Sequence, residues 1–265
     1  MDDLQEIAEV CERAARAGGG VLLDWAQRFT VREKGPADLV TEADLAAENV
    51  VRRTIAKAFP HHRFIGEEST PTEQVEGILN DPSSCVWVVD PLDGTTNYAH
   101  HIPHYACSVA AVRGGQILAG VIFQPVAEEC YIAIRGKGAT LNGDRLRTSS
   151  VSELGSALVA VSIPPQIQRD AAEVQKLLQI LEHAQSIRRT GSAALNMCYV
   201  ASGRLDAYWA IHTSVWDIAA GALLVSEAGG MICNPSGGPF DLSRPRPLAT
   251  ANPALKRELV GILQA

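Results

Sequence analysis

The sequence predicts an α+β protein with two lobes, on three observations. Apolar residues recur at helical spacing in two segments near the N-terminus, 4–29 and 41–59. Two strand-like runs, 106–113 and 116–124, flank a Gly-Gly pair, which is the pattern of a β-hairpin. Beyond a polar stretch at 147–155, strand-like and helix-like segments alternate. We therefore expect a mostly antiparallel sheet in the first lobe and a layered α/β unit in the second.

The polar stretch places the lobe boundary at residue 150, which gives lobes 1–150 and 151–265. A loop is expected at 34–38, between the first two helices, because Gly35 and Pro36 interrupt the periodicity there. The second lobe is expected to contain strands at 157–163, 186–189, 205–211 and near 231, and helices at 170–184, 192–202, 217–228 and 253–263, the last capped by Asn252.

Composition narrows the class of protein. With 265 residues, 46% of them hydrophobic, the chain can bury a large core. A net charge of −7 without a run of Lys or Arg argues against nucleic acid or an anionic membrane as a partner. The N-terminus is acidic, and no apolar run reaches the ~18 residues that a membrane span needs. Together with six widely spaced cysteines, which we expect to be reduced and buried, this predicts a cytoplasmic protein.

The stretch WVVDPLDGTTNY, residues 87–98, is the strongest candidate for a functional site. An apolar run ends in Asp90, and Asp93 and Gly94 follow within four residues. Because Pro91 fixes its φ angle and has no N–H, we expect the strand to stop there in a tight turn. The Thr-Thr-Asn that follows favours the start of a short helix with exposed N–H groups. Two carboxylates beside backbone donors could hold a hard divalent cation and a phosphate together.

Other candidate residues also have ordinary structural explanations. Thr41 and Asp44 have the spacing of a capping box, and Asp217 stands where a helix N-cap is expected. Lys34 could be a solvated surface charge, and the acidic pair at 67–68 is common on protein surfaces. Taken one at a time, these residues do not identify a site.

Taken together, several segments resemble the signatures of the inositol monophosphatase family, which are magnesium-dependent, lithium-sensitive phosphatases. The resemblance extends over nearly the whole chain. It implies a layered αβαβα sandwich, as in sugar phosphatases, assembled as a homodimer with the site between the lobes. The matching segments are Gly66-Glu67-Glu68, Asp90-Pro91-Leu92-Asp93-Gly94-Thr95-Thr96-Asn97, Trp216-Asp217-Ile218-Ala219-Ala220-Gly221, KGPADLVTEAD and Gly191-Ser192-Ala193-Ala194.

The resemblance also implies the site residues. One Mg²⁺ would be held by Glu67, Asp90 and the Leu92 carbonyl, a second by Asp90, Asp93 and Asp217, and a weaker third with help from Glu67. The implied catalytic residues are Glu67 and Thr95, which orient and deprotonate a water, with Asp44 supporting Thr95, and Lys34. The implied substrate-binding positions are Gly94, Thr95, Gly191, Ser192, Ala193 and Ala210.

One position departs from the pattern of relatives that prefer inositol. They carry a Glu seven residues before the aspartate of Trp-Asp, and this sequence has Ala210 there. Without that acceptor for hydroxyl groups, selectivity for a polyol should weaken.

The expected function is hydrolysis of a small alcohol or sugar phosphate resembling inositol 1-phosphate. Histidinol phosphate, fructose 1,6-bisphosphate and nucleotide 3′-phosphates stay open as substrates, as does a non-catalytic regulatory role on the same fold. Serine-hydrolase chemistry is rejected because the sequence has no GxSxG.

Overall fold

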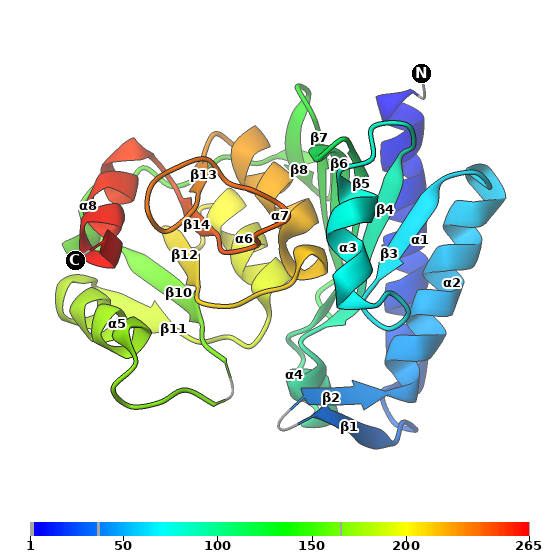
Figure 1. Ribbon diagram of the computed structural model, residues 1–265, viewed down its shortest axis with the longest axis horizontal. Helices are drawn as coiled ribbons and strands as arrows, with labels where there is room; N and C mark the ends of the chain where they lie inside the picture. Colours follow the sequence, from blue (N-terminus) through cyan, green and yellow to red (C-terminus); the bar gives the residue numbers. More distant parts are fainter. Residues whose placement is uncertain (1–2, 36–37, 165, 265) are drawn as a thin grey trace.

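The protein stacks its elements in five layers, helices and sheets in turn (Figure 1). The computed structural model describes residues 3–35, 38–164 and 166–264, without the side chains of 33–35, 38 and 39. Helices α1 and α2 cover the outer face of a seven-stranded sheet, and α6 and α7 lie between that sheet and a second, five-stranded one. Helices α5 and α8 cover the far face of the second sheet. This order confirms the predicted αβαβα sandwich.

The first two helices form where the apolar spacing predicts them. Helix α1, Leu4–Trp25, is capped by the Asp3 carboxylate, and α2 is Glu42–Ala58. Thr41 and Asp44 make the predicted capping box at the start of α2. Gly18 allows α1 to lie close on the sheet, since a Cβ at this position would be 2.7 Å from Cys107 Sγ.

The seven-stranded sheet carries the central motif. Its β3 and β4 are parallel, whereas the remaining neighbours are antiparallel. The hairpin predicted around Gly114-Gly115 is confirmed, because both glycines have positive φ and Arg113 pairs with Gln116. The strands, in sheet order, are β3 Arg63–Gly66, β4 Val86–Asp93, β5 Ala106–Arg113, β6 Gln116–Gln124, β7 Glu129–Ile134, β8 Gly138–Leu141 and β9 Asp144–Arg145.

The expectation that the central strand stops before Pro91 is wrong. Strand β4 continues to Asp93, and its register against β5 shifts between Asp90 and Asp93. Pro91 lies inside this irregularity, where its missing N–H removes no ladder hydrogen bond. The bulge thus keeps both aspartates on one strand.

The loop predicted at 34–38 is also corrected, because strands β1, Val31–Gly35, and β2, Asp38–Thr41, pair there as an antiparallel ribbon. Helix α3, Thr72–Leu79, and the 3₁₀ turn Leu154–Ser156 are further elements that the periodicity did not predict. These segments are short, so they contain too few residues to show a period.

The second sheet has the order β11-β10-β12-β14-β13. Its first three strands are parallel, and β14 is antiparallel to both neighbours. Asn252 caps the last helix as predicted, accepting from Ala254 and Leu255 N–H. The elements are β10 Leu158–Ser162, α5 Ala172–His183, β11 Ser186–Arg188, α6 Ala193–Ala201, β12 Ala207–Ala210, α7 Val215–Glu227, β13 Met231–Cys233, β14 Leu248–Thr250 and α8 Pro253–Gln264.

The largest apolar cluster surrounds α6 and α7 and joins the two sheets. It contains Val88 of β4, Tyr208 of β12 and Ile218 of α7, all fully buried. Because this cluster contains residues from both sides of residue 150, the predicted boundary between two lobes stays a prediction. All six cysteines are buried free thiols, as expected. Among the described residues, no helix combines the length and apolar character needed to cross a bilayer.

Candidate active site

Glu67 and Asp90 are brought together by the parallel pairing of β3 and β4. Gly66 pairs with Val89, and the Glu67 N–H donates to the Val89 carbonyl at 3.2 Å, so Glu67 lies beside Asp90. Asp90 is buried, and its Oδ1 accepts from the Leu92 N–H at 3.0 Å. The alignment of two neighbouring strand ends therefore positions the first pair of predicted ligands.

Sequence reasoning missed a third carboxylate beside this turn. Glu48 of α2 is buried, and its Oε2 accepts from the Glu68 N–H at 3.0 Å. A Cβ at Gly66 would stand 2.6 Å from the Glu48 carboxyl carbon, so glycine is needed for this approach. Glu48 supports the backbone that presents Glu67. The sequence signal for Glu48 was Arg52 four residues later, with which it forms a salt bridge. Such pairs are also typical of surface helices, so the spacing did not identify a buried residue.

Asp93 ends β4 and meets the first turn of α6. Its Oδ2 accepts from the Ser192 hydroxyl and from Ala194 N–H at 2.8 Å, and its Oδ1 accepts from Ala193 N–H at 3.1 Å. Ser192 Oγ in turn accepts from Leu195 N–H at 3.1 Å and so caps the helix. The positive end of α6 thus stabilises the charged form of Asp93.

Thr95 begins the short helix α4, Thr95–Ala99, as predicted for this stretch. Gly94 precedes it with a φ of 101°, a conformation that favours glycine. The Thr95 hydroxyl lies 3.1 Å from the Leu92 carbonyl and 3.4 Å from Asp44 Oδ1. Asp44 is buried, and its other oxygen accepts from Thr41 at 2.8 Å and 2.6 Å. Asp44 therefore caps α2 and contacts Thr95 with the same carboxylate.

Asn97 links the central motif to the second sheet. Its Nδ2 donates to the His104 carbonyl at 2.8 Å and to the Thr190 carbonyl at 2.9 Å. Gly191 follows with a φ of 88°, and a Cβ there would stand 2.8 Å from Asn97 Nδ2. A side chain at 191 would therefore separate the two segments. The sequence contains both residues but does not show that they touch.

Asp217 lies in the first turn of α7 and is half-buried. The expectation that Asp217 is the N-cap is wrong, because α7 begins at Val215 and Ser214 is the cap. Asp217 Oδ2 accepts from the Ser214 N–H at 2.8 Å, which completes a capping box. The sequence analysis started the helix two residues late, although Ser214 and Asp217 have the spacing of a capping box.

The four acidic side chains share one electrostatic environment. Burial raises the pKa of Asp90 well above its ordinary value, and the charges of Glu67, Asp93 and Asp217 raise it further. Burial, then the charges of Glu67 and Asp93, raise the pKa of Asp217 in the same way. Burial raises the pKa of Asp93 to about 6 against the opposing hydrogen bonds from the start of α6. These mutual effects place the carboxylates within one cluster.

A cavity of about 320 Å³ opens beside this cluster. Asp93, Gly191, Ala193 and Asp217 of the predicted set line it, whereas Glu67, Asp90, Gly94, Thr95 and Ser192 do not. Ala210 is fully buried and lines another cavity, of about 100 Å³, beside Trp209. The lining residues that the sequence analysis did not assign are Thr96, Asn97, Val161, Ser162, Ile163, Arg189, Thr190, His212 and Thr213.

The donor chemistry of the cluster suits a hard cation. Three aspartates, Glu67 and the Leu92 carbonyl offer oxygen atoms only, which is the ligand type that Mg²⁺ prefers. Over the described ranges, however, no three acidic, His or Cys side chains are gathered tightly enough to hold one ion. Asp93 and Asp217 instead direct oxygens to helix N-termini. The side chain of Lys34, predicted to be catalytic, lies outside the described residues.

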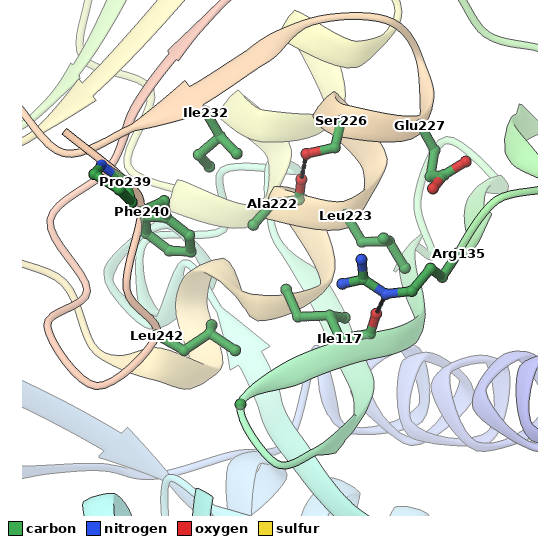
Figure 2. Close-up of a pocket in the computed structure, with 11 residues that line it drawn as sticks. Ile117, Arg135, Ala222, Leu223, Ser226, Glu227, Ile232, Pro239, Phe240 and Leu242 are labelled. Atoms are coloured by element: carbon green, nitrogen blue, oxygen red, sulfur yellow. Dashed lines mark hydrogen bonds between the residues drawn. The ribbon is translucent and has the colours of Figure 1, made fainter. Parts of the chain in front are cut away.

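A separate cavity lies at the opposite end of α7 (Figure 2). It has a volume of about 400 Å³, and Leu223, Phe240 and Leu242 make its apolar walls. Arg135 borders it, with its Nε donating to the Ile117 carbonyl. None of the predicted site residues lines this cavity. The C-terminal half of α7 lines this cavity, whereas Asp217 lies in the first turn of the same helix.

Comparison with known proteins agrees with this geometry. Residues 3–265 match the model of the inositol monophosphatase family. The chain is 39% identical to inositol monophosphatase 2 of Solanum lycopersicum over 98% of each chain, and 40% identical to Nus factor SuhB of Pseudomonas aeruginosa over 88% of this chain and 87% of that one.

A solved structure shares the fold. The crystal structure of extragenic suppressor protein suhB from Bartonella henselae superposes with a TM-score of 0.89 at 36% identity, covering 98% of both chains. The chain therefore belongs to the inositol monophosphatase family, a metal-dependent family of phosphoric monoester hydrolases.

Proposed function

We propose that this phosphatase is Mg²⁺-dependent and hydrolyses a small alcohol or sugar phosphate by attack of water on phosphorus. The observation that carries the proposal is the acidic cluster beside the 320 Å³ cavity. Asp93 and Asp217 come from different layers of the sandwich and line that cavity together. Carboxylates that raise one another's pKa repel a phosphate dianion, so a cation is needed between them and the substrate.

The ligand set follows from the oxygen donors. Glu67, Asp90 and the Leu92 carbonyl would hold one ion, and Asp90, Asp93 and Asp217 a second, with Asp90 shared. A third, weaker ion would add to Glu67. When bound, Mg²⁺ lowers the pKa of a coordinated water and offsets negative charge on the phosphate and the leaving oxygen.

Thr95 and Glu67 would orient and deprotonate the water. Asp44 accepts from Thr41 and lies within 3.4 Å of the Thr95 hydroxyl, so it orients Thr95. Glu67 can then accept the proton that the water loses. Lys34 belongs to this proposal through the resemblance alone. The N–H groups of Gly94 and Thr95, at the start of α4, would bind phosphate oxygens.

The remaining predicted substrate positions divide into three kinds. Ser192 and Ala193 donate to Asp93 and act on the substrate through that carboxylate. Gly191 lines the cavity, where its lack of a side chain leaves room for the alcohol. Ala210 is fully buried and presents no acceptor to hydroxyl groups, which supports a substrate other than a simple polyol phosphate.

A regulatory role is the alternative, and one observation favours it: the 40% identity to a protein named Nus factor SuhB. A net charge of −7 argues against direct binding of nucleic acid. We also propose a homodimer, supported by the exposed Leu178 and Leu181 on α5. The free thiols support a reducing compartment such as the cytoplasm.

Phosphate release from a panel of substrates tests the proposal. The panel contains inositol 1-phosphate, histidinol phosphate, fructose 1,6-bisphosphate and adenosine 3′-phosphate, each with Mg²⁺ and with excess chelator. We expect hydrolysis that requires Mg²⁺ for at least one ester. Undiminished hydrolysis in chelator would overturn the metal proposal, and no hydrolysis of any ester would favour the regulatory alternative.

A further inference from the structure

A second cavity adjoins the candidate active site. This cavity has a volume of about 370 Å³ and is lined by His212, Thr213, Arg244, Pro245 and Arg246. His212 and Thr213 also line the 320 Å³ cavity that contains Asp93 and Asp217. The two cavities therefore adjoin each other at the segment between β12 and α7.

The segment 243–247, Ser-Arg-Pro-Arg-Pro, forms one wall of the second cavity. Each arginine precedes a proline, which restricts its backbone to extended conformations. The Arg246 N–H donates to the Arg244 carbonyl at 2.7 Å, a tight turn centred on Pro245. This segment was not assigned a role by the sequence analysis.

Two hydrogen bonds tie the segment to the site. The Thr213 hydroxyl donates to the Pro245 carbonyl, and the Ala210 N–H donates to the Pro247 carbonyl at 3.2 Å. Thr213 is buried, and it stands four residues before Asp217. The wall is therefore fastened to the same segment that delivers Asp217, and the arginine backbones are fixed relative to the carboxylates.

The charge on this wall is unusual for an acidic protein. Arg244 and Arg246 are exposed, as is Arg189, which lines the first cavity. In the described part of the chain none of these three arginines forms a salt bridge. The nearby acids are Asp241, whose pKa Arg244 helps to lower, and Glu173, which lines a small cavity with Arg246.

We propose that Arg244 and Arg246 bind a second anionic group of the substrate, so that the preferred ester carries a phosphate or carboxylate besides the phosphate that is cleaved. This inference rests on the proposed function. Guanidinium groups suit both anions because they can donate two parallel hydrogen bonds. The scissile phosphate occupies the first cavity, and the second anion reaches past His212 to the wall formed by 243–247.

The absence of a hydrogen-bond acceptor at Ala210 agrees with a site that recognises the far end of the substrate by its charge. A site that selects a neutral polyol by hydrogen bonds needs acceptors for its hydroxyl groups. The second cavity instead offers two guanidinium groups, those of Arg244 and Arg246, beside His212 and Thr213. Selectivity therefore comes from charge at the far end of the substrate.

Two matched substrate pairs test the inference. Fructose 1,6-bisphosphate is compared with fructose 1-phosphate, and 2-phosphoglycerate with glycerol 2-phosphate. The members of each pair differ mainly by a second anionic group, a phosphate in the first pair and a carboxylate in the second. We expect at least one of the two-anion members to have a kcat/KM about tenfold or more above its partner, at constant Mg²⁺ and ionic strength.

The arginines are tested by the double variant Arg244→Gln, Arg246→Gln. We expect the ratio of kcat/KM for the two-anion over the one-anion member to fall about tenfold, chiefly through KM. The matched control is Arg13→Gln, Arg257→Gln, which removes the same charge from exposed positions on α1 and α8. Lysine at 244 and 246 should restore part of the ratio.

The outcomes separate this inference from the function on which it rests. If no member of either pair is hydrolysed, and no ester of the panel is, the proposed function fails. If one-anion members are hydrolysed as efficiently as their partners, the second-anion inference fails while the function stands. Equal ratios in the 244/246 variant and in the 13/257 control would also overturn the inference, because the preference would then come from the net charge.

Discussion

Asp93 at the end of β4 accepts a hydrogen bond from the hydroxyl of Ser192, the N-cap residue of α6. The Ala194 N–H donates to the same carboxylate oxygen at 2.8 Å. These bonds hold a proposed metal ligand of the first sheet against the start of α6. The same contact thus contributes to the fold, where it joins the first sheet to the helical layer beside it, and to the site, where it orients Asp93.

Ser192→Ala should separate these contributions. We expect a loss of about 1–2 kcal/mol in the free energy of unfolding, since the variant removes a helix cap and a hydrogen bond to a carboxylate. The kcat/KM should fall roughly tenfold, because Asp93 loses a bond that orients it. Urea unfolding and phosphate release measure the two effects. Ser202→Ala, at the other end of α6, is the control, and equal effects of both variants would contradict the special role of Ser192.

Asp90→Asn should abolish turnover while leaving the metal-free protein at least as stable. The amide keeps the shape of the side chain but removes its negative charge. Burial and three neighbouring carboxylates disfavour that charge, which is why the pKa of Asp90 is raised. We expect kcat to fall by roughly 10³ or more and the melting temperature without metal to stay equal or rise. Asp81→Asn is the control, because Asp81 is only partly buried and its pKa is lowered, first by hydrogen bonds from Ser83. Near-normal turnover in Asp90→Asn would refute its role as the shared ligand.

The metal-free protein should lose stability as pH rises, and Mg²⁺ should oppose this loss. The pKa of Asp93 is raised to about 6, so its protonated form favours the folded state. The stability that this group contributes is fully present below its ordinary pKa, near ~4, and is lost as pH rises through about 6. Asp90 and Asp217 shift in the same direction.

Thermal melts at pH 5 and pH 7.5 measure this effect. We expect Mg²⁺ to raise the melting temperature more at pH 7.5, where the carboxylates are charged and available to bind it. Sodium chloride at equal ionic strength is the control for screening. A Mg²⁺ effect of the same size at both pH values would contradict coupling between the carboxylates and the metal.

Gly191→Ala should destabilise the protein by about 2–4 kcal/mol and reduce activity. The positive φ disfavours alanine, and its Cβ would stand 2.8 Å from Asn97 Nδ2. Gly229→Ala is a matched control, since Gly229 has a φ of 93° and open space around its Cβ position. The excess loss at 191 over 229, measured by urea unfolding, reports the contact with Asn97. Equal losses would mean that this contact contributes nothing beyond backbone strain.

Much of the local structure could be predicted from the sequence. Thr41 and Asp44 cap α2 as their spacing predicts, and Gly114-Gly115 makes the hairpin between β5 and β6. These features depend on residues close in sequence, whose interactions are the same in any fold. The short strands β1 and β2 and the helix α3 were missed, because a few residues show no period and only packing decides their state.

The candidate site divides in the same way. Glu67, Asp90 and Asp93 could be grouped by the resemblance, and the pairing of β3 with β4 explains why the first two are neighbours. The bulge at Pro91, by contrast, depends on how β4 pairs with β5, and the sequence alone predicted a strand end.

By itself the sequence determined the family, the oxygen-donor chemistry of the site and the segments that carry it, because these depend on residue types and local spacing. The resemblance also grouped Asp217 with Asp93, and only the tertiary structure decided that Arg244 and Arg246 line a cavity next to the one that these two aspartates line. The physical reason is distance along the chain: α7 and the 243–247 segment reach Asp93 through packing of apolar layers, and no local pattern specifies which polar side chains that packing brings together.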